Sequence, residues 1–226
     1  MILQPFDPLH QKILLILISG WVIIPLLGKF SSDNIRQLLA FFIGVSIIFQ
    51  ESYLFFYRQY FEIFNPQKHI PIHLCSFSQF IAAYSLFTKS QRGFELAFYW
   101  AIAAAIQPIL TPELESTSID TQFIIFFLSH GLIILSVIWL LTVENRKLRY
   151  QSLKEVIIIT NILLIPTALV NWLFGSNYMF LCWKPAVENP LLMGEWPYYL
   201  LVFEALGISF FCISFFTMKL LGRVKI

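Results

Sequence analysis

The sequence predicts an all-α protein that crosses a membrane about seven times, and three observations support this fold class. Of the 226 residues, 58% are hydrophobic, only 12% are charged and 24 are phenylalanine. The apolar residues form unbroken runs of about 20 residues, the length that a helix needs to span a bilayer. These runs do not alternate with polar residues as the strands of a membrane β-barrel do, so we expect the backbone to form its hydrogen bonds within helices.

Charged residues and prolines divide the apolar sequence into seven segments. We predict spans at residues 13–28, 36–57, 71–88, 94–110, 121–142, 153–174 and 198–220. The segments 71–88 and 94–110 are short for a hydrocarbon core about 30 Å thick, and 71–88 could instead be re-entrant because it carries several polar side chains. No small-residue cleavage pattern follows 13–28, so we keep it as a span. Residues 1–226 are expected to form a single membrane domain.

The distribution of the 15 Lys and Arg residues predicts the orientation. With seven spans, most of them fall on the side of the C-terminus: Lys29, Arg36, Lys89, Arg92, Arg146, Lys147, Arg149, Lys154, Lys219, Arg223 and Lys225. The positive-inside rule places that side in the cytoplasm and the N-terminus outside. We therefore expect a multi-pass protein of the cell (plasma) membrane.

Composition also limits the partners. The net charge is only +2, and no basic stripe with interleaved aromatic residues occurs, so nucleic acid is not an expected ligand. Membrane lipids are the expected partners. No cofactor motif and no paired metal-ligand spacing such as CxxC or HExxH is present, so neither a cofactor nor a metal is expected. The sequence carries no signal for an oligomeric state.

Polar residues gather in the outer halves of the predicted spans. The set includes Glu51, His73, Gln79, His130 and Glu204. An ionisable residue inside a membrane is costly and usually functional, and these residues come from different helices at a similar depth, so the sequence favours a polar pocket that opens outward. The alternative is that they satisfy one another as hydrogen bonds between helices, with Glu51 supported by Arg58 seven residues later.

Cys75 is the candidate nucleophile. Pro71 suits the first turn of a helix, which would place Cys75 near a helix N-terminus, where the helix dipole favours a thiolate. His73 is only two residues away and would point elsewhere on a regular helix, so His130 from another span is the better candidate for the base. Gln79 follows Cys75 by four residues, shares its face and could donate to an oxyanion.

Other interpretations of Cys75 remain open. A free cysteine is often a small buried hydrophobic residue, and Cys182 on the same outer side could form a disulfide with Cys75. A metal site made of His73, Cys75 and His130 is the weakest interpretation, because the paired spacing of metal ligands is missing.

Two outer connections complete the predicted site. The segment from about 175 to 197 is rich in tryptophan and tyrosine, which prefer the headgroup layer, so we expect it to cover the site as a lid. Glu113, in the connection after residue 110, could line the pocket, although a loop carboxylate is more often solvated.

Five short motifs resemble a known family. They are His73-Leu74-Cys75, Pro112-Glu113, Ser129-His130-Gly131, Asn177-Tyr178-Met179 and Gly194-Glu195-Trp196-Pro197. In this order, over about residues 70 to 200, they resemble the YwaF and transmembrane protein 164 family of integral membrane proteins. The resemblance implies a cysteine-dependent acyltransferase that moves fatty acyl chains between phospholipids. It makes Cys75 the acyl acceptor and His130 its base, with Asn177, Tyr178 and Trp196 in substrate-binding or supporting positions.

Residue chemistry and resemblance lead to the same first hypothesis, a thiol-dependent phospholipid acyltransferase or lipid hydrolase that forms an acyl-thioester at the outer membrane face. A transporter or binding protein for a small polar solute is the alternative, with Glu51, His130 and Glu204 as binding or proton-relay groups. The absence of an inverted repeat disfavours it. A third possibility is a non-catalytic scaffold that binds lipid.

Overall fold

The computed structural model describes residues 3–112, 114, 119–184 and 193–225. Its helices are α1 (Pro8–Phe30), α2 (Asp33–Tyr60), α3 (Pro66–His69), α4 (Leu74–Thr88), α5 (Gln91–Trp100), α6 (Ile106–Leu110), α7 (Thr121–Thr142), α8 (Ser152–Phe174) and α9 (Tyr198–Leu220). A π-helical segment, Ala101–Ala105, joins α5 to α6, and a 3-10 turn, Tyr178–Phe180, precedes α9. The all-α class is therefore confirmed.

The helices follow the predicted apolar runs closely. Among the described residues, six helices have the length and hydropathy to cross a membrane: α1, α2, the continuous helix Gln91–Leu110, α7, α8 and α9. The remaining run, 71–88, forms α4, which has 15 residues. At 1.5 Å per residue, α4 is roughly 22 Å long, shorter than the hydrocarbon core. The chain is thus a multi-pass membrane protein, and the full count of seven crossings stays a prediction.

Local sequence explains where several helices begin. Asp7 accepts a hydrogen bond from the backbone N–H of His10 and caps α1, and Asp120 caps α7 in the same way through Phe123. The prediction that Pro71 starts the third segment was wrong. The helix begins at Leu74, because His73 adopts an extended conformation and occupies the N-cap position.

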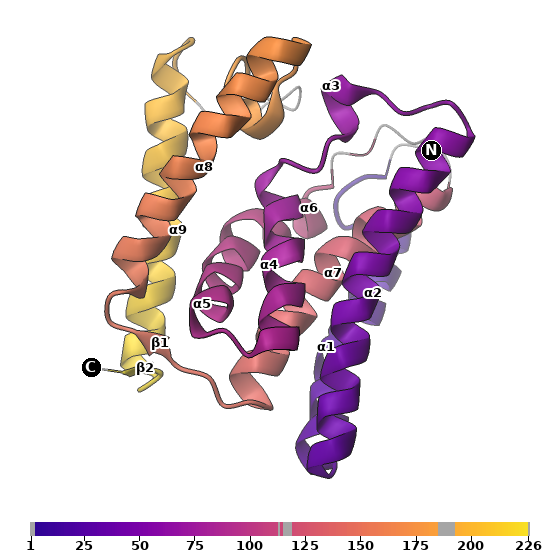
Figure 1. Ribbon diagram of the computed structural model, residues 1–226, viewed down its shortest axis with the longest axis vertical. Coiled ribbons are helices and arrows are strands. Elements are labelled where there is room, and N and C mark those ends of the chain that lie inside the picture. The colour runs from indigo at the N-terminus through magenta and orange to yellow at the C-terminus, as the bar shows by residue number, and fades with distance from the viewer. Residues whose placement is uncertain (1–2, 113, 115–118, 185–192, 226) are drawn as a thin grey trace.

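The helices form three groups. In Figure 1, α8 and α9 lie side by side, α4, α5 and α7 form the middle, and α1 and α2 lie on the other side. In the apolar windows of Gln91–Leu110 and α7, 61% and 67% of the residues are buried, against 11% to 17% in α1, α8 and α9. The helix Gln91–Leu110 and α7 therefore form the core, and the peripheral helices α1, α8 and α9 present their apolar side chains to lipid.

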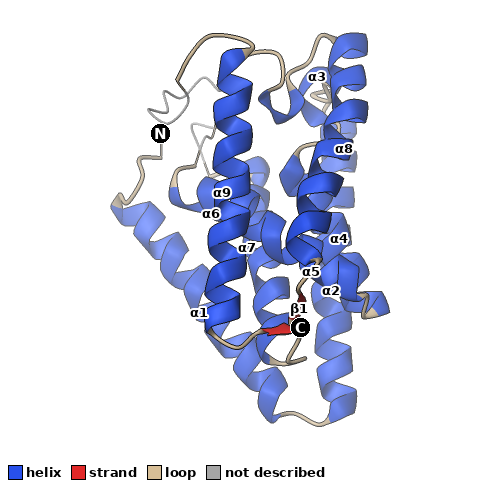
Figure 2. Ribbon diagram, turned by 90° about the vertical axis from the view of Figure 1, so that its left-hand side faces the viewer, coloured by secondary structure: helices blue, strands red, loops and turns tan. Residues whose placement is uncertain are grey.

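The two chain ends lie at opposite ends of the bundle, as Figures 1 and 2 both show. Near the C-terminus, the two-residue strands β1 (Leu148–Arg149) and β2 (Val224–Lys225) pair in parallel, with Leu148 opposite Val224. This small sheet, the one β element of the described residues, ties the last segment of the chain to the connection between α7 and α8.

Candidate functional site

Cys75 lies at the second residue of α4, where this helix meets the π-helical segment. Its Sγ donates a hydrogen bond to the carbonyl oxygen of Ala104 at 3.4 Å, and its side chain is largely buried. Because π-helical segments inside longer helices are frequent at functional sites, this contact marks the junction as a candidate site. Cys75, Cys182 and Cys212 are all free thiols, so the structure does not contain the Cys75–Cys182 disulfide considered above.

His73 faces the loop between α8 and α9 rather than the helix interior. Its Nδ1 accepts a hydrogen bond of 3.4 Å from the backbone N–H of Met179, and its ring packs edge-on against Tyr178 with centroids 5.0 Å apart. A neutral imidazole that accepts at Nδ1 carries its proton at Nε2. His73 is therefore set up as a hydrogen-bond donor through Nε2.

His130 has the opposite arrangement. Its Nδ1 lies 2.7 Å from the carbonyl oxygen of Phe126, which can only accept, so the proton is on Nδ1. The ring is buried in α7, and among the described residues Nε2 has no hydrogen-bond partner. His130 therefore has the tautomer that a general base requires.

The structure packs α7 against both α4 and the π-helical segment. It thus brings together the helices that carry Cys75 and His130, but among the described residues no hydrogen bond joins the two side chains. Each is bonded to a backbone carbonyl instead, Cys75 to Ala104 and His130 to Phe126. In this arrangement the Cys75 thiol is a hydrogen-bond donor to a backbone carbonyl.

A second polar cluster links α2 to α4 one turn below Cys75. Gln50 and Gln79 are both buried, and Gln50 Nε2 donates to Gln79 Oε1. Glu51 interacts with Gln79 and with the positive charge of Arg58, which in turn interacts with Tyr178. The Gln79 amide is therefore engaged between the helices, and its role as an oxyanion donor stays a prediction.

Two atoms of this cluster, Gln50 Oε1 and Arg58 Nε, are buried without a hydrogen-bond partner among the described residues. A buried polar atom usually has a partner, because its desolvation is otherwise uncompensated. One acceptor and one donor in the same cluster fit a site that receives a polar ligand group.

The loop between α8 and α9 is held near the start of α4 by buried and partly buried hydrogen bonds. Asn171 accepts from the backbone N–H of Tyr178 at 2.7 Å and donates to the Tyr178 carbonyl at 3.0 Å. The Tyr178 hydroxyl donates to the Pro66 carbonyl at 2.6 Å and accepts from the N–H of Ile70 at 2.8 Å. Asn177 organises the following turn by accepting from the N–H groups of Cys182 and Trp183.

The same loop holds strained backbone. Met179 and Phe180 have φ values of 55° and 54°, in the left-handed region that residues with a Cβ rarely adopt. Tyr199 donates to the Phe180 carbonyl and Trp196 donates to the Leu181 carbonyl at 3.1 Å, so aromatic residues near the start of α9 secure the turn. Strain of this kind persists where the surroundings enforce it, and it clusters at functional sites.

Some predicted residues do not join this region. Glu204 accepts a 2.8 Å hydrogen bond from Asn161, and this contact links α9 to α8 rather than to the Cys75 junction. Glu113 lies outside the described residues. No group of three or more His, Cys, Asp or Glu side chains that could hold a metal ion occurs in the described part of the chain.

Two residues of this region were not predicted, Ala104 and Gln50. The Ala104 carbonyl belongs to a run of alanines, and nothing in Ala103-Ala104-Ala105 predicts a π-helical segment. Gln50 is uncharged, unlike Glu51 beside it, but a glutamine within a predicted span is itself a usable signal.

Comparisons with known proteins place the chain in a family. The model of the TMEM164 family matches residues 5–215, nearly the whole chain. No curated protein and no solved structure matches it. The match includes all five motifs noted in the sequence and every residue of the Cys75 junction. The chain therefore belongs to the TMEM164 family.

Proposed function

We propose that this membrane protein is a thiol-dependent phospholipid acyltransferase or lipid hydrolase with Cys75 as its nucleophile. The observation that carries the proposal is the free, largely buried Cys75 thiol at the junction of α4 and the π-helical segment, beneath a strained loop. The activity is the one that the family resemblance implies, and the hydrogen bonds that set the tautomers of His73 and His130 also support it.

The first half-reaction forms an acyl-thioester. His130 Nε2 takes the proton of Cys75, and the sulfur forms a bond to the ester carbonyl carbon of a phospholipid. The ester carbon–oxygen bond breaks, and the lysophospholipid leaves with the proton that the His130 imidazolium returns. The negative charge that develops on the carbonyl oxygen requires a hydrogen-bond donor, and His73 Nε2–H supplies one.

The second half-reaction releases the acyl chain. A lysolipid hydroxyl or water gives its proton to His130, and its oxygen attacks the thioester carbonyl. The Cys75 thiolate leaves and recovers a proton from the imidazolium. Both halves are redox-neutral, and every atom and proton transferred comes from the lipids or water, with Cys75 and His130 returned to their starting forms.

A local rearrangement must precede the chemistry. The Cys75 proton is held by the Ala104 carbonyl and the His130 proton by the Phe126 carbonyl, so the thiol has to rotate toward Nε2. Binding of an acyl chain between α4, α7 and the π-helical segment provides a reason for this rotation. Hydrogen bonds of catalytic groups are often completed only when substrate is bound.

An acyl-labelling experiment tests the proposal. The purified protein is given a phospholipid with a labelled acyl chain, and hydroxylamine-labile label is located by mass spectrometry. We expect label on Cys75, no thioester label in Cys75→Ser, and slower labelling by about 100-fold in His130→Gln. The matched control is Cys212→Ser, which keeps wild-type labelling because Cys212 lies in α9 away from the junction. Undiminished hydroxylamine-labile label in Cys75→Ser would exclude the mechanism.

The proposal includes the outer face of the plasma membrane as the place of reaction. It is supported by the excess of Lys and Arg at the opposite end of the bundle. Cys182 offers a direct test, since it is exposed in the loop before α9. In Cys75→Ser/Cys212→Ser, a membrane-impermeant maleimide should label intact cells as fully as lysed cells. Labelling that requires lysis would place this loop in the cytoplasm.

A further inference from the structure

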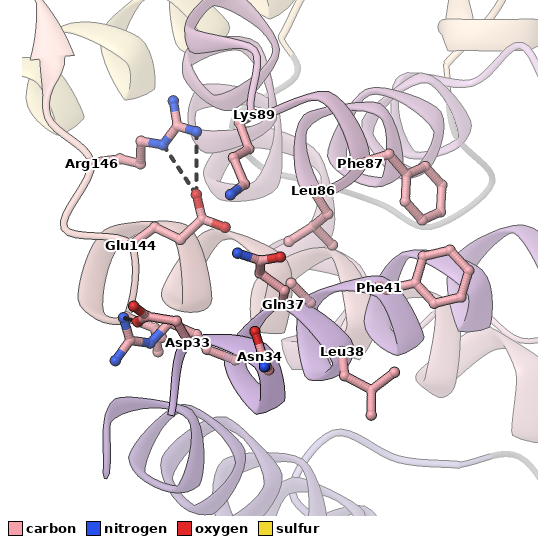
Figure 3. A pocket seen from close by; sticks show the side chains of 13 residues that line it. Asp33, Asn34, Gln37, Leu38, Phe41, Leu86, Phe87, Lys89, Glu144 and Arg146 are labelled. Atoms are coloured by element: carbon pink, nitrogen blue, oxygen red, sulfur yellow. Dashed lines mark hydrogen bonds and ion pairs between the residues drawn. The ribbon is translucent and has the colours of Figure 1, made fainter. Parts of the chain in front are cut away.

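A groove of about 970 Å³ lies at the end of the bundle away from Cys75. It is bounded by the beginning of α2, the end of α4 and the segment that follows α7 (Figure 3). One part of its lining is polar and carries Arg36, Lys89 and Arg146, and the other part is apolar. The groove shares no residue with the site proposed above.

The charges of the groove leave one cation without a partner. Arg36 forms an ion pair with Asp33 at 2.9 Å, and Arg146 forms one with Glu144 at 3.2 Å. Lys89, exposed at the end of α4, has no ion pair within the described part of the chain. Figure 3 shows its side chain pointing into the groove, on the side of Gln37 and Glu144. With both acids already paired, the groove is complementary to a ligand with one negative charge.

Two amides lie beside this charge. Asn34 and Gln37 both line the groove on α2, and among the described residues neither side chain forms a hydrogen bond. Each amide offers two donors and one acceptor oxygen. Such groups suit hydroxyls, which donate and accept, better than a quaternary ammonium, which does neither.

The apolar part of the groove continues into the lipid-facing surface. Leu38, Phe41 and Phe87 are 53%, 53% and 43% exposed, and the rings of Phe41 and Phe87 lie 5.8 Å apart. On α2 and α4 these side chains lie within one to two helical turns of the polar residues of the groove. A polar headgroup site is thereby joined to a surface on which acyl chains can lie.

We propose that this groove binds an anionic phospholipid with a hydroxylated headgroup, of which phosphatidylglycerol is the simplest. Lys89 and the free donors of Arg146 bind the phosphate, Asn34 and Gln37 bind the headgroup hydroxyls, and one acyl chain lies along Phe41 and Phe87. Phosphatidylcholine is disfavoured because it carries no net charge and no headgroup hydroxyl. The proposal does not depend on the acyl-transfer reaction.

Native mass spectrometry of the purified protein with defined lipids tests the proposal. Wild type is mixed with equal amounts of phosphatidylglycerol, phosphatidylethanolamine and phosphatidylcholine. We expect phosphatidylglycerol to be retained preferentially, and Lys89→Gln to lower its retention about tenfold, as the loss of one charge-assisted contact implies. Lys29→Gln is the matched control, because Lys29 lies at the same end of the bundle but does not line the groove. Equal retention in Lys89→Gln and wild type would overturn the assignment.

A second variant tests the headgroup contacts. Asn34→Ala/Gln37→Ala keeps the cation, so it should retain phosphatidic acid, which lacks headgroup hydroxyls, as well as wild type does. Wild type should retain phosphatidylglycerol in preference to phosphatidic acid, and the double variant should lose this preference. Both amides are exposed, so folding is expected to be unaffected, which the melting temperature checks. A preference that survives this substitution, or equal retention of phosphatidylethanolamine by wild type, would contradict the proposal.

Discussion

The Tyr178 hydroxyl donates a 2.6 Å hydrogen bond to the carbonyl oxygen of Pro66, and it accepts one from the N–H of Ile70. Through these two bonds the loop before α9 is tied to the connection that leads into α4. Because Cys75 is the second residue of α4, the position of the candidate nucleophile depends on a contact made by a residue more than 100 positions later in the chain. Tyr178 is thus a positioning residue.

Tyr178→Phe should destabilise the protein and loosen this connection. The substitution leaves the Pro66 carbonyl and the Ile70 N–H without their partner, which costs about 1–3 kcal/mol in the free energy of unfolding. Thermal unfolding in detergent measures the loss. Tyr198→Phe is the control, since Tyr198 is 68% exposed, and it should shift stability by less than about 0.5 kcal/mol. Equal melting temperatures for Tyr178→Phe and wild type would show that the bonds contribute nothing.

Alkaline pH should remove the difference in unfolding free energy between wild type and Tyr178→Phe. Burial raises the pKa of Tyr178 above its ordinary value of 10.0, so the neutral, donating form is favoured in the folded state. The stabilisation is therefore fully present below pH 10 and is lost as the pH rises through the raised pKa. The difference in unfolding free energy should be constant from about pH 7 to 9 and narrow above about pH 10. A difference that grows with pH would contradict this assignment.

Arg149 binds two carboxylates at the opposite end of the bundle. Its Nη2 lies 2.6 Å from Glu95 and 2.8 Å from Glu155, and these hydrogen bonds raise the pKa of its guanidinium. The Glu95 side chain is only 4% exposed and forms its ion pair with Arg149. Arg149→Ala should lower the free energy of unfolding by about 3 kcal/mol, because it leaves a buried carboxylate unpaired.

Arg92→Ala is the matched control for Arg149→Ala. Arg92 also pairs with Glu155, at 3.4 Å, but its side chain is 73% exposed. An exposed ion pair contributes about 0–1 kcal/mol, so this variant should stay close to wild type. Chemical denaturation of the two variants side by side gives the comparison. Losses of equal size would mean that burial of Glu95 does not determine the effect.

The sequence predicts where the helices of this protein lie better than it predicts which face of each helix packs against its neighbours. Long apolar runs define α7, α8 and α9 to within one residue, and α1 and α2 to within five, because in lipid an apolar run has no alternative to a helix. The beginning of α4 was missed because two conformations compete there. Pro71 allows a helix to start, but the extended backbone of His73 delays it to Leu74.

The sequence predicted how deep in the membrane the candidate site residues lie, but not the direction in which each side chain points. His73 packs against Tyr178 beside the start of α4, whereas Glu204, at a similar predicted depth, pairs with Asn161 on a different side of the bundle. Span boundaries give the height of a residue in the membrane, but the direction in which it points depends on helix packing, which a hydropathy pattern does not contain.

Close packing between α1 and α7 gives the last prediction. The indole ring of Trp139 is fully buried and lies directly against Gly28, where an added Cβ would overlap two of its ring carbons. Gly28→Ala should therefore cost about 1–3 kcal/mol through overpacking. Gly20→Ala on the same helix meets nothing within 4 Å, so it should be neutral or stabilise by up to about 1 kcal/mol through better helix propensity. Melting temperatures that fall equally in both variants would show that α1 does not pack on Trp139.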